Sequence, residues 1–282
     1  MQHQHALRSR NEDAGDIRLL AGAAAILAGA VLADSAIEHY RGSFRNPAMF
    51  AALGASSLSL VASADAARHR PALPAPARRA AFGVAALTGV IGTGFHLYNL
   101  LQRPGRLSLR DFFYGAPIGA PAALTLSGLT GLAGEALRTG PSGWSPRFFG
   151  LSAGRSLAAL SALGLFGTVG EAALLHFRGS FQNPFMLLPV SLPPIAAGLM
   201  ARIALWPRAG GHDLARRWLK LTALLGLTGS LFHGYGVHRG MGGWRNWRQN
   251  ILNGPPVPAP PGFTGLALVG LAALRLLGRQ GA

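Results

Sequence analysis

Long stretches of apolar residues alternate with short polar segments along the whole chain. Each stretch has about 20 residues and few charges, which is the length that an α-helix needs to cross a hydrocarbon core. The pattern predicts an all-α integral membrane protein with eight transmembrane helices, near Ile17–Ile37, Pro47–Ala67, Arg79–Leu101, Gly115–Leu137, Ala153–Leu175, Pro184–Trp206, Arg216–His238 and Pro260–Gly278.

The second half of the chain resembles the first. A shift of 137 residues places the segment HYRGSFRNP, at 39–47, on HFRGSFQNP, at 176–184. Beyond a two-residue insertion, GAPIGAP at 115–121 matches GPPVPAP at 254–260. Four helices are an even number, so both halves enter the membrane in the same direction. We therefore expect two parallel four-helix repeats related by a pseudo-twofold axis along the membrane normal.

The repeat divides the chain into five segments. The expected order is a cytoplasmic leader at 1–16, a first repeat at 17–140, a linker at 141–152, a second repeat at 153–278 and a tail at 279–282. The first apolar stretch follows a polar leader and has no cleavage site after it, which is typical of a retained helix rather than a signal peptide.

The charge of the chain is strongly positive, with 26 Lys and Arg against 10 Asp and Glu. The basic residues lie in the loops and at helix ends, where anionic lipid headgroups explain them, so we expect lipid and not nucleic acid as the partner. Most of them fall on the side of the N-terminus, which predicts a multi-pass protein of the bacterial inner membrane with both termini in the cytoplasm.

Ionisable residues gather at one predicted end of the bundle. They close the helices that run outward, and burying them in lipid costs a few kcal/mol each, so we expect them to face the interior and to form a functional site. The candidates are Asp34, Glu171, His96, His233, His39 and His176.

Three kinds of cofactor fit these residue types, and the absence of cysteine excludes thiolate ligands. Asp34, Glu171, His96 and His233 predict a site for Fe, Mn or Zn, with one ligand from each of four helices. Alternatively, histidines form the axial pair of a haem b across the twofold axis, with loop arginines near the propionates. A quinone is the third expectation.

The repeated loop segment also has a purely structural interpretation. Gly42 and Gly179 would end their helices in the left-handed region, and each Asn-Pro pair would begin the next helix. Arg41 and Arg178 would stabilise the helix C-termini. A second set of residues is expected to contact anions or a partner protein, although its aromatic members also suit the headgroup belt: Arg41, Arg178, Arg45, His238, Trp244 and Trp247.

Three functions remain open at this stage. The leading hypothesis is a subunit of a periplasm-facing redox complex, either electron-transferring or non-catalytic, that anchors other subunits on the periplasmic side. The second is a proton- or cation-coupled transporter that uses Asp34 and Glu171. The third is a scaffold whose buried polar groups only fix helix packing.

Overall fold

Long helices make up most of the protein in a computed structural model. The structure describes residues 2–103, 108, 111–112, 115, 117–140, 146–148, 150–207 and 211–280, with side chains from residue 13 to residue 279. The long helices are α1 (Gln2–Arg41), α2 (Met49–Ala66), α3 (Ala75–Leu101), α5 (Gly119–Thr139), α6 (Ala153–Arg178), α7 (Leu188–Leu205), α8 (Asp213–His238) and α10 (Pro261–Gln280). The short elements are β1 (Arg147–Phe148), β2 (Leu151–Ser152), η1 (Pro184–Leu187), η2 (Gly243–Asn246) and α9 (Trp247–Asn253).

Six helices in the described part of the chain are long and apolar enough to cross a membrane, as expected of an all-α, multi-pass membrane protein. The stretches are Asp13–Arg41, Met49–Ala66, Ala75–Leu101, Ala153–Arg178, Pro184–Leu205 and Pro261–Arg279. Helices α5 and α8 are long but less apolar: α5 contains Glu135 and Arg138, and four charged residues lie in the first turns of α8. The structure thus supports six of the eight predicted spans.

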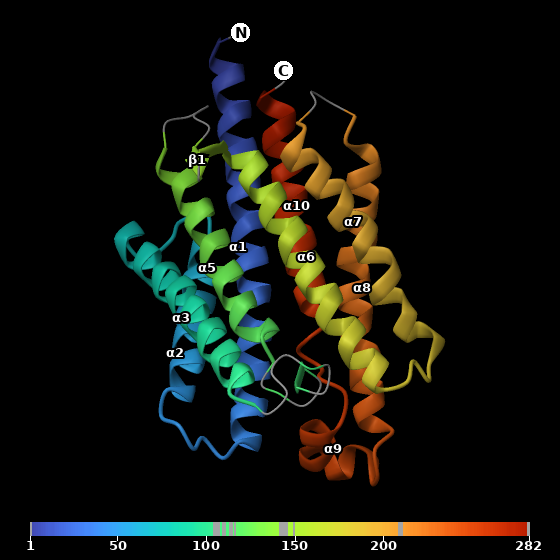
Figure 1. The fold of residues 1–282 in the computed structure, drawn as a ribbon. Coiled ribbons are helices and arrows are strands. Elements are labelled where there is room, and N and C mark those ends of the chain that lie inside the picture. Colours follow the sequence, from blue (N-terminus) through green and yellow to red (C-terminus); the bar gives the residue numbers. More distant parts are fainter. Residues whose placement is uncertain are drawn as a thin grey trace.

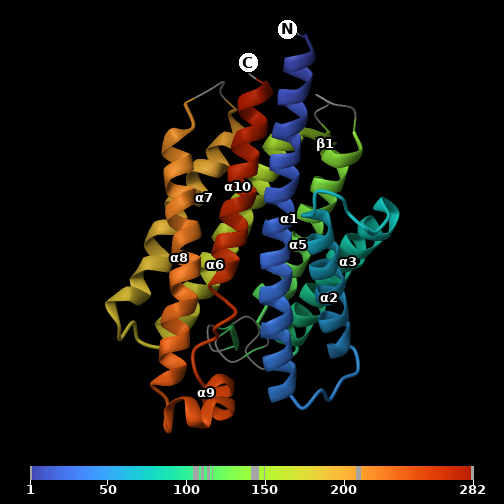
Figure 2. The same cartoon turned by 180° about the vertical axis from the view of Figure 1, so that it is seen from behind.

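Four helices form the centre of the bundle. Helix α1 packs against α5 and α10, while α6 packs against α10 and α5. Helices α2 and α3 flank this centre on one side, and α7 and α8 flank it on the other (Figures 1 and 2). The buried core is apolar, and its fully buried side chains include Leu20, Leu27, Leu165, Leu219 and Leu266.

The bundle has two chemically different ends. Both chain termini lie at one of them, here called the terminal end (Figure 1). Helix α9 and the C-termini of α1, α3, α6 and α8 lie at the other, here called the histidine end. Helices α1, α3, α6 and α8 therefore run in one direction, which is why residues distant in sequence gather at the histidine end.

Corresponding helix contacts occur in the two halves of the chain. Ser127 of α5 donates to the carbonyl of Ala24 in α1 at 2.8 Å, and Ser161 of α6 donates to the carbonyl of Leu266 in α10 at 2.9 Å. The repeat matches Ala24 with Ser161 and Ser127 with Leu266. In each half, one hydrogen bond thus joins the first long helix to the last. The donor is on the last helix, α5, in the first half and on the first helix, α6, in the second half.

Candidate functional site at the histidine end

The repeated loop ends α1 and α6 in the same way. In α1 the N–H of Ser43 donates to Tyr40 O and that of Phe44 to His39 O, which is the pattern of a Schellman motif. The left-handed residues are Ser43 (φ 57°) and Phe44 (φ 46°), and Ser180 and Phe181 adopt the same conformation. The motif also packs Phe44 edgewise against the His39 ring at 6.2 Å, as Phe181 packs against His176.

The expected left-handed glycines need a correction, because the first left-handed residue of each loop lies one position later than predicted. Gly179 has φ −82°, and Gly42 is not among the residues with positive φ. The left-handed position falls on the following serine instead. The Asn-Pro prediction holds for the second half, where Asn183 caps η1 and its Oδ1 accepts from Phe185 N at 3.1 Å. In the first half Asn46 Oδ1 accepts from Ala48 N at 3.0 Å, but this bond lies in the turn before α2, whose N-cap is Ala48.

Three histidines contact a backbone carbonyl through the same ring nitrogen. Nδ1 lies 2.6 Å from Pro117 O in His96 and 2.7 Å from Pro256 O in His233. In His176, Nδ1 lies 2.8 Å from the carbonyl of Met186 at the start of the next helix. Because a carbonyl oxygen can only accept, each Nδ1 carries a proton, and in the neutral imidazole the lone pair then lies on Nε2.

His39 completes this set with a difference. Its Nδ1 is buried beside the backbone of Met49, the residue matched to Met186, and has no hydrogen-bond partner among the described residues. Each of the four imidazoles therefore lies beside the part of the chain that follows its own helix.

The four imidazoles lie in two pairs, one in each half. His39 interacts electrostatically with His96, and His233 does so with His176. Each pair joins the first and third long helix of its half.

The two carboxylates lie between the halves. Asp34 is close enough to Glu38 and Glu171 for their charges to act on it. The Glu171 carboxylate accepts from the N–H of Gly119 at the start of α5, where the helix dipole favours an anion. A Cβ at Gly119 would overlap that carboxylate. The residue matched to Gly119 is Pro258, which has no N–H, so Asp34 has no equivalent donor there.

The described residues contain no group of three or more His, Asp or Glu that could hold a metal ion. The predicted four-ligand site made of Asp34, Glu171, His96 and His233 is therefore without support.

The residues expected to contact anions or a partner are at the same end. Arg41 pairs with Glu38 at 2.8 Å, and the side chain of Arg45 is exposed. Trp244 and Trp247 are more than half exposed, and His238 stacks on Trp244 with ring centroids 5.2 Å apart. Arg178 closes α6 at the position matched to Arg41.

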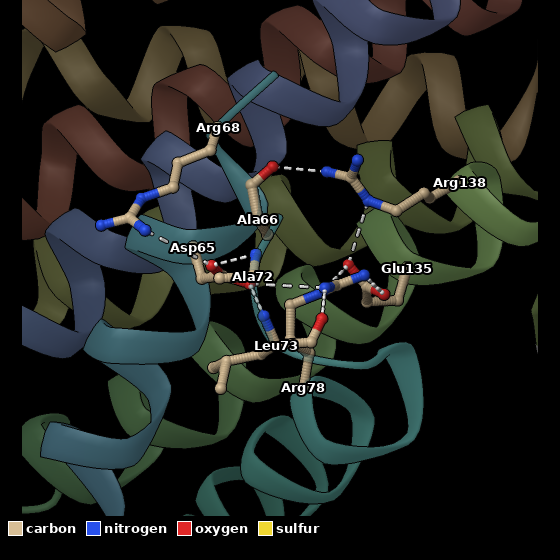
Figure 3. Close-up of polar contacts among 8 residues, drawn as sticks. All are labelled: Asp65, Ala66, Arg68, Ala72, Leu73, Arg78, Glu135 and Arg138. Carbon is tan, nitrogen blue, oxygen red and sulfur yellow. Dashed lines mark hydrogen bonds and ion pairs between the residues drawn. The ribbon is translucent and has the colours of Figure 1, made fainter. Parts of the chain in front are cut away.

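Sequence reasoning missed a buried network at the terminal end (Figure 3). Arg78 donates through Nε and Nη2 to both oxygens of Glu135 at 2.9 Å, and its Nη1 reaches Asp65 at 3.4 Å and Leu73 O. Asp65 in turn accepts from the backbone N–H of Ala72 and Leu73. The sequence shows only that Asp65, Arg78 and Glu135 lie near the ends of their helices, as solvated residues often do. Their contact becomes visible only when the helices are packed against each other.

Comparisons with protein-family models, with curated proteins and with solved structures found no match. The functional argument therefore rests on the geometry of this chain.

Proposed function

We propose that this chain is a membrane subunit of a redox complex in the bacterial inner membrane, and that each of its two histidine pairs holds one haem b at the periplasmic side. The proposal includes eight spans, two parallel repeats about a pseudo-twofold axis, and both termini in the cytoplasm. It is carried by one observation: His39 and His96, and likewise His176 and His233, lie close enough at one end of the bundle for the charge of one imidazole to act on the other.

The hydrogen bonds of the rings support ligation. Histidines that bind a metal usually donate their second ring N–H to a carbonyl or carboxylate, which fixes the tautomer and the ring orientation. His96, His176 and His233 make this bond through Nδ1. Their Nε2 atoms have the lone pairs that bind haem iron.

A pair of imidazoles is sufficient for this chemistry. Haem iron takes four ligands from the macrocycle and two axial ligands from the protein, so neither Asp34 nor Glu171 is needed. Stacked Phe185 and Phe232, with ring centroids 4.9 Å apart, add aromatic surface beside the second pair. A reduced quinone would donate its hydroxyl hydrogens to the same lone pairs, and the experiment below separates the two.

A soluble partner is the expected source or acceptor of electrons. Met241, Trp244 and Trp247 expose apolar surface at the same end, and α9 reaches across to α1 through the bond from Arg248 to Tyr40 at 3.3 Å. Exposed aromatic side chains of this kind are typical anchors at protein interfaces.

The transporter is the second candidate, and the proximity of Asp34 and Glu171 favours it. A carrier of protons needs a polar path to the opposite face. The helices between these carboxylates and the terminal end are filled with buried leucines, including Leu20, Leu27 and Leu165. Loss of substrate-driven proton uptake in the Asp34→Asn, Glu171→Gln double variant would favour transport over redox chemistry.

The test of the redox proposal is the absorbance spectrum of the detergent-purified chain, oxidised and after dithionite, with pyridine haemochrome and metal analysis. The informative substitutions are His96→Asn and His233→Asn, because the Asn amide can still donate to the carbonyls of Pro117 and Pro256 but has no atom in place of Nε2. We expect a Soret band that weakens in each single variant and is lost in the double variant.

His69→Asn is the matched control, because His69 lies at the terminal end. A spectrum that His96→Asn and His233→Asn leave unchanged would contradict the proposal. So would a purified protein free of haem and metal. If extraction of such a protein yields a bound quinone, the ligand of this site is a quinone and not a haem.

A further inference from the structure

A cavity of about 200 Å³ lies at the terminal end of the first half. Its walls come from α1, from the connection after α2 and from the end of α5. Four of its lining residues are basic, namely Arg18, Arg68, His69 and Arg138, and Asp13 is the one acid among the lining residues that the structure describes.

The positive charge of this cavity is only partly compensated. Asp13 is engaged by Arg279 at 2.6 Å, outside the basic cluster. Arg18 uses Nε to donate to Ala14 O at 3.2 Å, and its terminal nitrogens make no hydrogen bond to the described residues. Arg68 is 65% exposed and lies 3.9 Å from Asp65, so its donors are also accessible.

Arg138 is held in place by the buried network. Its Nε donates to Glu135 at 3.2 Å, and one terminal nitrogen donates to the carbonyl of Ala66. Figure 3 shows Arg68 and Arg138 on either side of Ala66. A guanidinium fixed in this way loses little conformational entropy when it binds an anion.

The cavity also has an apolar part. Ile17 and Leu137 line it beside the arginines. It lies near the ends of two candidate spans, Asp13–Arg41 and Met49–Ala66, which is the level of the lipid headgroups. Basic pockets between helices at this level bind the phosphates of anionic lipids, whose acyl chains continue along the apolar surface.

We propose that this cavity binds the phosphate group of an anionic phospholipid. Arg18, Arg68 and Arg138 donate to its oxygens, and Ile17 and Leu137 contact the glycerol region. The second half has no such cluster, because the positions matched to Arg68, His69 and Arg138 are Leu205, Trp206 and Leu277. One site per chain follows, and it does not depend on the redox proposal.

The experiment is native mass spectrometry of the full chain in detergent, titrated separately with phosphatidylglycerol, phosphatidylcholine and inorganic phosphate. We expect phosphatidylglycerol to bind more tightly than phosphatidylcholine, with one tight site. The Arg18→Gln, Arg68→Gln double variant should weaken that site about tenfold, since charge-assisted bonds to phosphate are lost. Both arginines are exposed, so the variant is expected to fold, and its elution profile checks this.

Two controls remove a similar charge elsewhere. Arg70→Gln alters the same connection without touching the cavity lining. Arg155→Gln alters the residue matched to Arg18, whose Nε already donates to Ala204 O at 2.9 Å. Weakening by either control equal to that of the double variant would overturn the proposal, as would equal binding of the two lipids. If the arginines were needed for binding of inorganic phosphate but not of phosphatidylglycerol, the ligand would be free phosphate and not a lipid.

Discussion

The two halves of the chain differ most at the terminal end. In the first half, Arg78 and Glu135 are buried and joined by two hydrogen bonds. The positions that the repeat matches to them hold Ala215 and Leu274, which pack in the apolar core. The same place in the bundle is thus filled by an ion network in one half and by apolar side chains in the other.

At the histidine end the two halves agree. Both keep the left-handed serine, the aromatic residue packed on a histidine, and the Nδ1 contact to a carbonyl two residues after the matched glycine. The second half therefore lacks the equivalent of the Arg78–Glu135 network, whereas the geometry at the histidine end is common to both halves. The features that the two halves share therefore lie mainly at the histidine end.

The largest effect is expected from breaking the network at one residue. Glu135→Leu leaves Arg78 buried without its main partner, and it should cost about 3–5 kcal/mol of stability, as removal of one member of a buried ion pair does. Reversible unfolding in mixed detergent micelles measures the difference.

The paired variant Arg78→Met, Glu135→Leu makes the first half more like the second. It should recover most of the lost stability, because apolar residues of similar volume replace the whole pair. If the paired variant were as unstable as Glu135→Leu alone, the network would be needed for the fold of the first half, and the two halves would not be interchangeable at this end.

A smaller effect, equal in both halves, is expected at two glycines where helices cross closely. A Cβ at Gly89 would overlap the backbone of Thr125, and one at Gly226 would lie 2.7 Å from Thr264 N. Gly89→Ala and Gly226→Ala should each cost about 1–3 kcal/mol, since the helices must separate. Gly83→Ala and Gly234→Ala are the controls, because no atom lies within 4 Å of their added Cβ. Losses that differ strongly between the halves would speak against equivalent crossings.

The left-handed serines should respond alike as well. Ser43→Val and Ser180→Val place a β-branched residue at φ 57° and 58°, which should cost about 1–2 kcal/mol each. The glycine variants at the same positions should show no such loss, because glycine adopts this conformation freely. Thermal unfolding in detergent compares the four variants, and a valine that is tolerated in only one half would show that the loops are not equivalent.

Much of the fold was predictable from the sequence because the apolar pattern and the repeat act over long stretches. The apolar blocks locate the long helices, and the even number of blocks in each half predicts that Asp34, Glu171 and the histidines lie at one end. The Asn-Pro start of η1 was predictable for a local reason, since a side-chain cap needs only neighbouring residues.

The remaining features depend on facts that no local pattern contains. Whether His96 meets His39 or His233 depends on the rotation of α3 about its axis. The left-handed position lies on Ser43 and not on Gly42, where Phe44 of the same loop packs on His39, a contact that the sequence pattern does not contain. The network of Arg78 and Glu135 forms only because the ends of α3 and α5 meet in the bundle.

The smallest expected effect concerns Glu38, which pairs with Arg41 in the first half at 2.8 Å. The second half has Leu175 at the matched position, while its arginine, Arg178, is retained. Both side chains of the pair are more than a third exposed, so Glu38→Leu should change stability by no more than about 0.5 kcal/mol. Micelle unfolding measures this, with Arg41→Gln as the second variant. A loss well above that bound would mean that Glu38 acts on Asp34 or His39, whose charges it faces, and that the first half has a polar cluster which the second half lacks.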